Sequence, residues 1–159
     1  MYDRFVNYQL YMSAALSEAR AAAAAGEAAD GAVAVLDEAL VVRGHSQVLA
    51  TGDPTAHAVL VVVREAARKL GRSDLRGVVI FTAIEPCAMC VGALLESDVD
   101  GLVFAMPDPV AGAAGSAIQL TSGTFLPRRL EVVSGIMQRE AAEILDGAPP
   151  ALRAPAARA

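Results

Sequence analysis

The chain has 159 residues, of which 55% are hydrophobic and 19% charged, so a disordered chain is excluded and one domain with one core is expected. The formal net charge of −5 argues against a broad electrostatic surface for nucleic acid. Apolar runs are shorter than the roughly 18 to 20 residues of a membrane span, and the first ten residues contain no apolar secretory segment. We therefore expect a cytoplasmic protein, with residues 1–146 in a single domain and residues 147–159 as a flexible tail.

The first half of the chain is expected to contain a helix, a β-hairpin and a second helix. Residues 1–25 place their apolar side chains broadly on one side of an amphipathic helix. After a turn that includes Asp30, two β-rich runs at 31–37 and 38–50 predict a hairpin. A second helix is expected over 53–71, because its opening DPT sequence puts Asp at the cap and Pro in the first turn.

The second half continues the alternation of helices and strands. The expected elements are a buried-type strand at 77–84, a helix at 87–98, a strand at 101–106, a turn-rich loop at 107–116, a short strand at 131–136 and a helix at 137–145. Helices that alternate with strands imply a sheet covered on both faces. The fold class is therefore predicted to be α/β, a three-layer α/β/α sandwich around a central mixed sheet of about five strands.

Three side chains stand out as metal ligands: His57 in TAHAV, and Cys87 and Cys90 in EPCAMC. The two cysteines fall in the first turn of one predicted helix, where residues three apart share a face. His57 lies in the first turns of the preceding helix, and parallel strands would bring both helix starts to the same edge of the sheet. A histidine and two thiolates that meet there form a zinc site with an open fourth position, which is typical of catalytic zinc. A thioredoxin-like redox pair is the alternative, although it leaves the DPTAH segment unexplained.

TAHAV and EPCAMC resemble the ligand segments of the cytidine and deoxycytidylate deaminase superfamily, zinc enzymes with the pattern H-x-E and P-C-x-x-C. RGH, DPTAHA and the later GAAGS are also similar, so the resemblance covers most of the chain. The most similar members are the tRNA-adenosine deaminases and the guanine deaminases. The resemblance implies a cytidine-deaminase-type sandwich, a dimer, and Zn²⁺ held by His57, Cys87 and Cys90.

The main departure from that pattern is Val59, which stands two residues after His57, where these deaminases have a glutamate. In the family this glutamate moves a proton from zinc-bound water to the base and then to the departing ammonia. General acid–base groups contribute about 10²- to 10⁴-fold to a rate, and Val59 cannot replace one. No catalytic residue is therefore assigned. Glu85 and Asp108 are the remaining candidates, although Glu85 is more readily explained as part of the motif's frame.

Two residues are candidates for substrate binding. Ser46 follows RGH, where purine-binding relatives usually carry an asparagine whose amide can hydrogen-bond the base, and Ser46 offers only a short hydroxyl. An ordinary structural role at the end of a strand explains Ser46 equally well. Asp108 lies in the 107–116 loop, which in the family lines the substrate cleft.

These residues predict a zinc-binding deaminase-family protein without the usual proton shuttle. The interpretation favoured by the sequence is a catalytically impaired subunit, a pseudo-deaminase, that forms a homodimer, pairs with an active relative or binds a base-like ligand. The alternative is a zinc-dependent hydrolytic deaminase of a nucleobase, nucleoside or related amine that uses a substitute acid or base. A tRNA ligand is less favoured because the chain is acidic. A third interpretation is that Val59 was introduced to disable the site.

Overall fold

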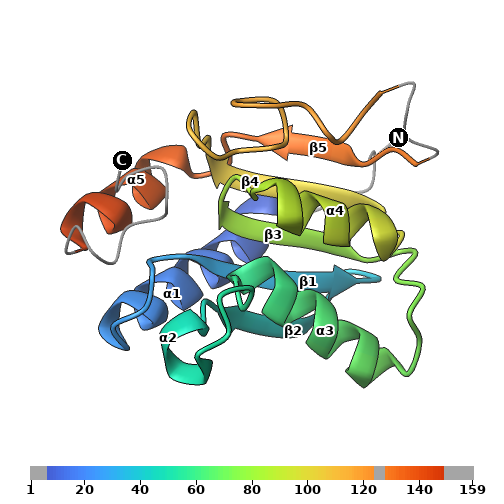
Figure 1. Cartoon of the computed structure of the whole chain (residues 1–159), viewed down its shortest axis with the longest axis horizontal. Helices are drawn as coiled ribbons and strands as arrows, with labels where there is room; N and C mark the ends of the chain where they lie inside the picture. The colour runs from blue at the N-terminus through green and yellow to red at the C-terminus, as the bar shows by residue number, and fades with distance from the viewer. Residues whose placement is uncertain (1–6, 124–127, 149–159) are drawn as a thin grey trace.

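The computed structural model describes residues 7–123 and 128–148. Its centre is a five-stranded mixed sheet in the order β2-β1-β3-β4-β5 (Figure 1). β1 is antiparallel to both of its neighbours, whereas β3, β4 and β5 are mutually parallel. The strands are β1 (Gly31–Leu36), β2 (Ala39–His45), β3 (Val79–Ile84), β4 (Gly101–Met106) and β5 (Glu131–Ser134).

Helices cover both faces of this sheet, so the predicted three-layer α/β/α sandwich is confirmed (Figure 1). α3 and α4 pack on one face against side chains such as Ile80 and Leu102. α1 and α5 pack on the other face against Phe81 and Val103, the next residues along the same strands. The alternation follows from the two-residue period of a strand. The helices are α1 (Tyr8–Ala24), α2 (Val48–Thr51), α3 (Ala58–Leu70), α4 (Ala88–Glu96) and α5 (Gln138–Gly147).

The predicted hairpin is present, but its second strand is shorter than expected. Asp37 and Glu38 form the turn with φ of 50° and 62°, the left-handed conformation at both central positions that a tight hairpin favours. β2 ends at His45, and the short helix α2 occupies part of the predicted strand 38–50. The physical reason is the Glu27 carboxylate, which accepts hydrogen bonds from the backbone N–H groups of Leu49 and Ala50 at 3.1 and 2.7 Å.

The helix predicted from Asp53 starts later, at Ala58, so that boundary was wrong. Asp53 does act as a cap, but it caps a turn. Its carboxylate accepts hydrogen bonds from the Thr55 backbone N–H at 2.8 Å and the Thr55 hydroxyl at 2.7 Å. His57 then adopts an extended conformation as the N-cap of α3. The correction matters because it places His57 just before the helix rather than inside it.

The ends of the chain are described only in part. Residues 1–6 of the first predicted helix lie outside the described residues, as do residues 149–159 of the predicted flexible tail. α5 continues to Gly147, one residue into that predicted tail. Among the helices that the structure describes, none is both long and apolar enough to cross a bilayer.

Candidate metal centre

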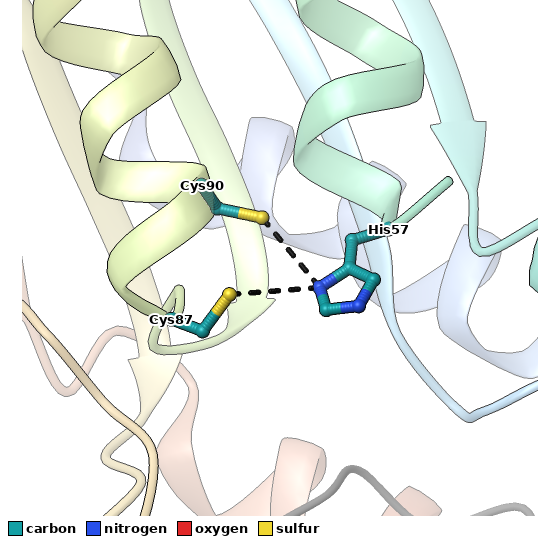
Figure 2. A group of neighbouring side chains, drawn as sticks. All are labelled: His57, Cys87 and Cys90. Carbon is teal, nitrogen blue, oxygen red and sulfur yellow. Dashed lines mark hydrogen bonds between the residues drawn. The ribbon is translucent and has the colours of Figure 1, made fainter. Parts of the chain in front are cut away.

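His57, Cys87 and Cys90 meet at one edge of the sheet (Figure 2). The His57 Nδ1 atom lies 3.6 Å from the Cys87 Sγ atom and 3.7 Å from the Cys90 Sγ atom. His57 is the N-cap of α3, Cys87 is the N-cap of α4, and Cys90 lies in the first turn of α4. The three residues predicted as ligands are therefore brought together.

The direction of the strands explains why the two helix starts coincide. α3 follows β2 and α4 follows β3, and both strands are antiparallel to β1, which lies between them. β2 and β3 consequently run in the same direction, and their carboxyl ends lie at the same edge of the sheet. The chain passes directly from β3 into α4, and from β2 through α2 and the turn at Asp53 into α3, which packs on the same face. The two helix N-termini therefore lie side by side (Figure 2).

The three donor atoms fit a tetrahedral zinc ion. With Zn–S near 2.3 Å and Zn–N near 2.0 to 2.1 Å, tetrahedral geometry puts sulfur and nitrogen about 3.6 Å apart. The observed separations of 3.6 and 3.7 Å match that value. Within the described part of the chain, no fourth histidine, cysteine or carboxylate joins this group. Three protein ligands with one open position define the class of catalytic rather than structural zinc sites.

The two thiols are electrostatically unequal before a metal binds. The pKa of Cys87 is lowered to about 4, first because the Cys90 thiol donates a hydrogen bond to it and then because His57 lies beside it. The same hydrogen bond, together with burial, raises the pKa of Cys90. One thiolate is thus already available, and a bound cation deprotonates a coordinating thiol outright.

Val59 lies within the apolar core cluster that also contains Cys90. It is the second residue of α3, and only 1% of it is exposed. An aliphatic side chain there can exclude water but can neither accept nor donate a proton. The sequence already indicates that no acid–base group stands at this position. In the structure, the valine side chain is tightly packed there and leaves no open gap.

The carboxylate of Glu85 holds the loop that follows β4. It is buried and accepts backbone hydrogen bonds from Asp108, Ala114 and Ser116 at 2.9 to 3.0 Å. Asp108 is also buried, and its side chain accepts from the backbone N–H groups of Val110 and Ala111 at 3.0 Å. These contacts support a framework role for both residues. Catalysis by either one, and substrate binding by Asp108, stay predictions.

Glu85→Gln is expected to destabilise this loop by about 1 to 3 kcal/mol, the range for leaving a buried backbone donor unsatisfied. In the variant, the amide nitrogen of glutamine must face at least one of the three backbone N–H groups that now donate a hydrogen bond to the carboxylate. Urea unfolding gives the change in stability, and hydrogen exchange at Ala114 and Ser116 locates it. Glu96→Gln, at an exposed position, is the matched control. Equal stability of the two variants would contradict the framework role.

Ser46 is buried at the end of β2, and its hydroxyl lies 3.5 Å from a Glu27 carboxylate oxygen. Its backbone N–H donates to the Asp30 carbonyl at 3.2 Å. These contacts support the structural explanation for Ser46. A role in substrate binding remains a prediction.

Asp30 is the residue that the sequence analysis missed, because it was interpreted only as part of a turn. Its carboxylate accepts a hydrogen bond from the Thr82 hydroxyl at 3.4 Å. Burial raises the pKa of Asp30 to about 7, against the lowering effects of His57 and of that hydrogen bond. Asp30 also interacts electrostatically with Cys87 and Cys90. The available signal was an acidic residue directly before the apolar run GAVAVL, where burial of the strand would draw it inward.

Comparison with known proteins agrees with the fold and with a zinc-binding domain. The cytidine and deoxycytidylate deaminase zinc-binding region matches residues 6–106, and the chain belongs to this family. The tRNA-specific adenosine deaminase of Bacillus subtilis is 35% identical over 137 residues, which cover 86% of this chain and 85% of that protein. The tRNA-specific adenosine deaminase of Agrobacterium fabrum is 36% identical over 135 residues, covering 85% and 89%.

Comparison with solved structures also identifies a deaminase fold. A structure from a study of A-to-I editing by tRNA:A34 deaminases at the wobble position of transfer RNA superimposes with a TM-score of 0.83 and 35% identity, covering 86% of this chain and 99% of that one. The guanine deaminase of Nitrosomonas europaea has a TM-score of 0.73 over 87% of this chain and 82% of its own, at 24% identity, which is a likeness of fold. The chain thus carries a zinc-binding deaminase domain, with His57, Cys87 and Cys90 placed to hold the ion.

Proposed function

We propose that this protein is a zinc-dependent aminohydrolase that replaces the exocyclic amino group of a nucleobase or nucleoside with oxygen. The observation that carries the proposal is the three-ligand site with its open fourth position. A zinc ion held by these residues would lower the pKa of water and so would supply a nucleophile at neutral pH. His57, Cys87 and Cys90 hold the ion, and the loop fixed by Glu85 passes beside Cys87.

A small substrate is favoured over tRNA by the charge of α5. This helix leaves the carboxyl end of β5, at the same edge of the sheet as the metal ligands, because β5 is parallel to β3 and β4. It carries one basic residue, Arg139, and three acidic ones, Glu140, Glu143 and Asp146. A net negative helix that starts at this edge of the sheet opposes a phosphate backbone there. The relatives named above as tRNA deaminases make tRNA the substrate to test against nucleosides.

Chelation of zinc is expected to reduce ammonia release to background, and one equivalent of added zinc should restore it. The assay compares adenine, guanine, cytosine, their nucleosides and a tRNA, each at high enzyme concentration. The physical reason is that the protein ligands position the nucleophile only through the ion. Magnesium serves as the control, because thiolate ligands favour zinc over this hard cation. Absence of turnover on every substrate by the zinc-loaded protein would contradict the proposed activity.

The second candidate function is a non-catalytic subunit that keeps the zinc site and pairs with an active relative. It is favoured by one observation, the buried aliphatic Val59 at the position of the family's proton shuttle. Such a protein would show no turnover by itself. It would gain turnover in the Val59→Glu variant, and it would form a complex with an active relative. Size-exclusion chromatography of the mixture, with rates measured on the peak, tests this candidate. A monodisperse protein that is active by itself would eliminate it.

A further inference from the structure

Asp30 occupies the edge of the sheet at which the zinc ligands meet, and the strand directions require this. β1 is antiparallel to both β2 and β3, so the start of β1 lies beside the ends of the two strands that lead to His57 and Cys87. Gly31 pairs with His45 on β2, and Ala32 pairs with Thr82 on β3. Asp30 directly precedes this pairing. We propose that Asp30 is the acid–base group of this site and performs the proton transfers that Val59 cannot.

The surroundings of Asp30 leave its carboxyl group incompletely satisfied. The Thr82 hydroxyl has one hydrogen but lies within reach of three acceptors, Asp30 Oδ1 at 3.4 Å and the carbonyl oxygens of Gly31 at 3.2 Å and Ile84 at 3.3 Å. Of the lysines and arginines in residues 7–123 and 128–148, none forms an ion pair with Asp30. Besides the long, shared hydrogen bond from Thr82, the Asp30 carboxylate has one backbone hydrogen bond, from Gly31, and the remaining acceptor positions can exchange a proton with a neighbouring molecule.

The other buried carboxylates near this edge already accept hydrogen bonds from backbone N–H groups. Glu85 accepts three backbone hydrogen bonds and Asp108 accepts two. Glu27 accepts two from the start of α2. These backbone hydrogen bonds occupy acceptor positions of the three carboxylates. Asp30 differs from these three because it accepts one backbone hydrogen bond, from Gly31, and its other hydrogen bond, from Thr82, is long and shared.

The protonation of Asp30 suits this role. Burial raises the pKa of Asp30 to about 7 without a metal, and a divalent cation nearby would lower it by favouring the charged form. The two effects act in opposite directions on the pKa of Asp30. An ionised but weakly stabilised carboxylate is the state that accepts a proton from water.

The proton transfers assigned to Asp30 rest on the proposed deaminase function. The oxygen of water forms a bond to the amino-bearing ring carbon, and its first proton passes to the Asp30 carboxylate. Asp30 returns that proton to the adjacent ring nitrogen, which has gained the electron pair of the C=N bond. The remaining hydroxyl proton then passes through Asp30 to the amino nitrogen. The C–N bond breaks with its electron pair on nitrogen, ammonia leaves and a carbonyl group forms.

The central test compares wild type, Asp30→Asn and the double variant D30N/V59E. Asparagine keeps the shape of Asp30 but cannot carry the proton, so the deamination rate should fall about 10²- to 10⁴-fold. Zinc content should stay at one per chain, because Asp30 is not a ligand. The added carboxylate in D30N/V59E should recover most of the lost rate. Asp37→Asn, in the exposed turn at the other end of β1, is the matched control and should behave as wild type.

A second readout does not depend on turnover. In the Co²⁺-substituted protein, the pH-dependent visible absorption reports proton loss at the metal. Removing the nearby negative charge should lower the midpoint of that transition by about one pH unit in D30N. Asp37→Asn should leave the midpoint unchanged.

The possible outcomes separate the two proposals. If D30N keeps its rate within a few-fold of an active wild type, Asp30 is not the acid–base group, whereas the deaminase function stands. If zinc-loaded wild type is silent on every substrate while V59E turns over, the proposed function and the role of Asp30 both fail. If D30N alone loses activity, D30N/V59E regains it and the cobalt midpoint shifts, both proposals are supported.

Discussion

Cys87→Ser is expected to lower zinc affinity by at least about 100-fold, more than the 10- to 100-fold typical of losing an outer-shell partner. The Cys87 sulfur lies 3.6 Å from His57 Nδ1, and it is the thiol whose pKa is already lowered to about 4. A serine hydroxyl is not ionised at neutral pH and is a poor zinc ligand, so only His57 and Cys90 would remain. Metal analysis and competition with a chromophoric chelator measure the change.

The matched control for this variant is Ala88→Ser, which adds a hydroxyl at the next, exposed position of α4. It should retain one zinc per chain. Because Cys87 is only half-buried, the fold of the apo-protein should survive its substitution, and circular dichroism checks this. Stoichiometric, tight zinc binding by Cys87→Ser would show that the three-ligand centre is wrong.

Gly31→Ala is expected to destabilise the protein by about 3 kcal/mol or more, at the upper end of the range for overpacking. A Cβ atom at Gly31 would lie 2.4 Å from the Ala15 carbonyl oxygen and 2.4 Å from the Ala19 backbone nitrogen. Both are backbone atoms of α1, so the whole helix has to move away from β1. Denaturant unfolding measures the change in free energy.

Gly92→Ala makes the same chemical change with the opposite expected sign. Gly92 lies in α4, and a Cβ atom there meets nothing within 4 Å. Alanine is the better helix former by about 0.8 to 1.0 kcal/mol, so the variant should be slightly more stable than wild type. Similar unfolding free energies for the two glycine variants would contradict the close packing of α1 on β1.

Local signals in the sequence predicted most of the secondary structure. The hairpin turn at Asp37-Glu38 and the strands β3 and β4 were predicted within two residues of their observed bounds, because apolar runs bounded by turn residues specify such elements. The start of α3 and the end of β2 were wrong. In both cases a side-chain carboxylate accepts hydrogen bonds from backbone N–H groups. Asp53 accepts from Thr55, and Glu27 accepts from Leu49 and Ala50. The Glu27 contact joins residues more than twenty positions apart, which no local pattern reveals.

The identity of the zinc ligands was predicted from the sequence, because His57, Cys87 and Cys90 stand in the segments TAHAV and EPCAMC that match the ligand pattern of the family. The start of the helix beside His57 was not. The missing shuttle at Val59 was visible in the same way, as a residue type at a fixed spacing from His57. Only the tertiary structure placed Asp30 among these groups. The order β2-β1-β3 puts the start of β1 between the ends of its two antiparallel neighbours, and strand order depends on long-range pairing that short windows of sequence do not encode.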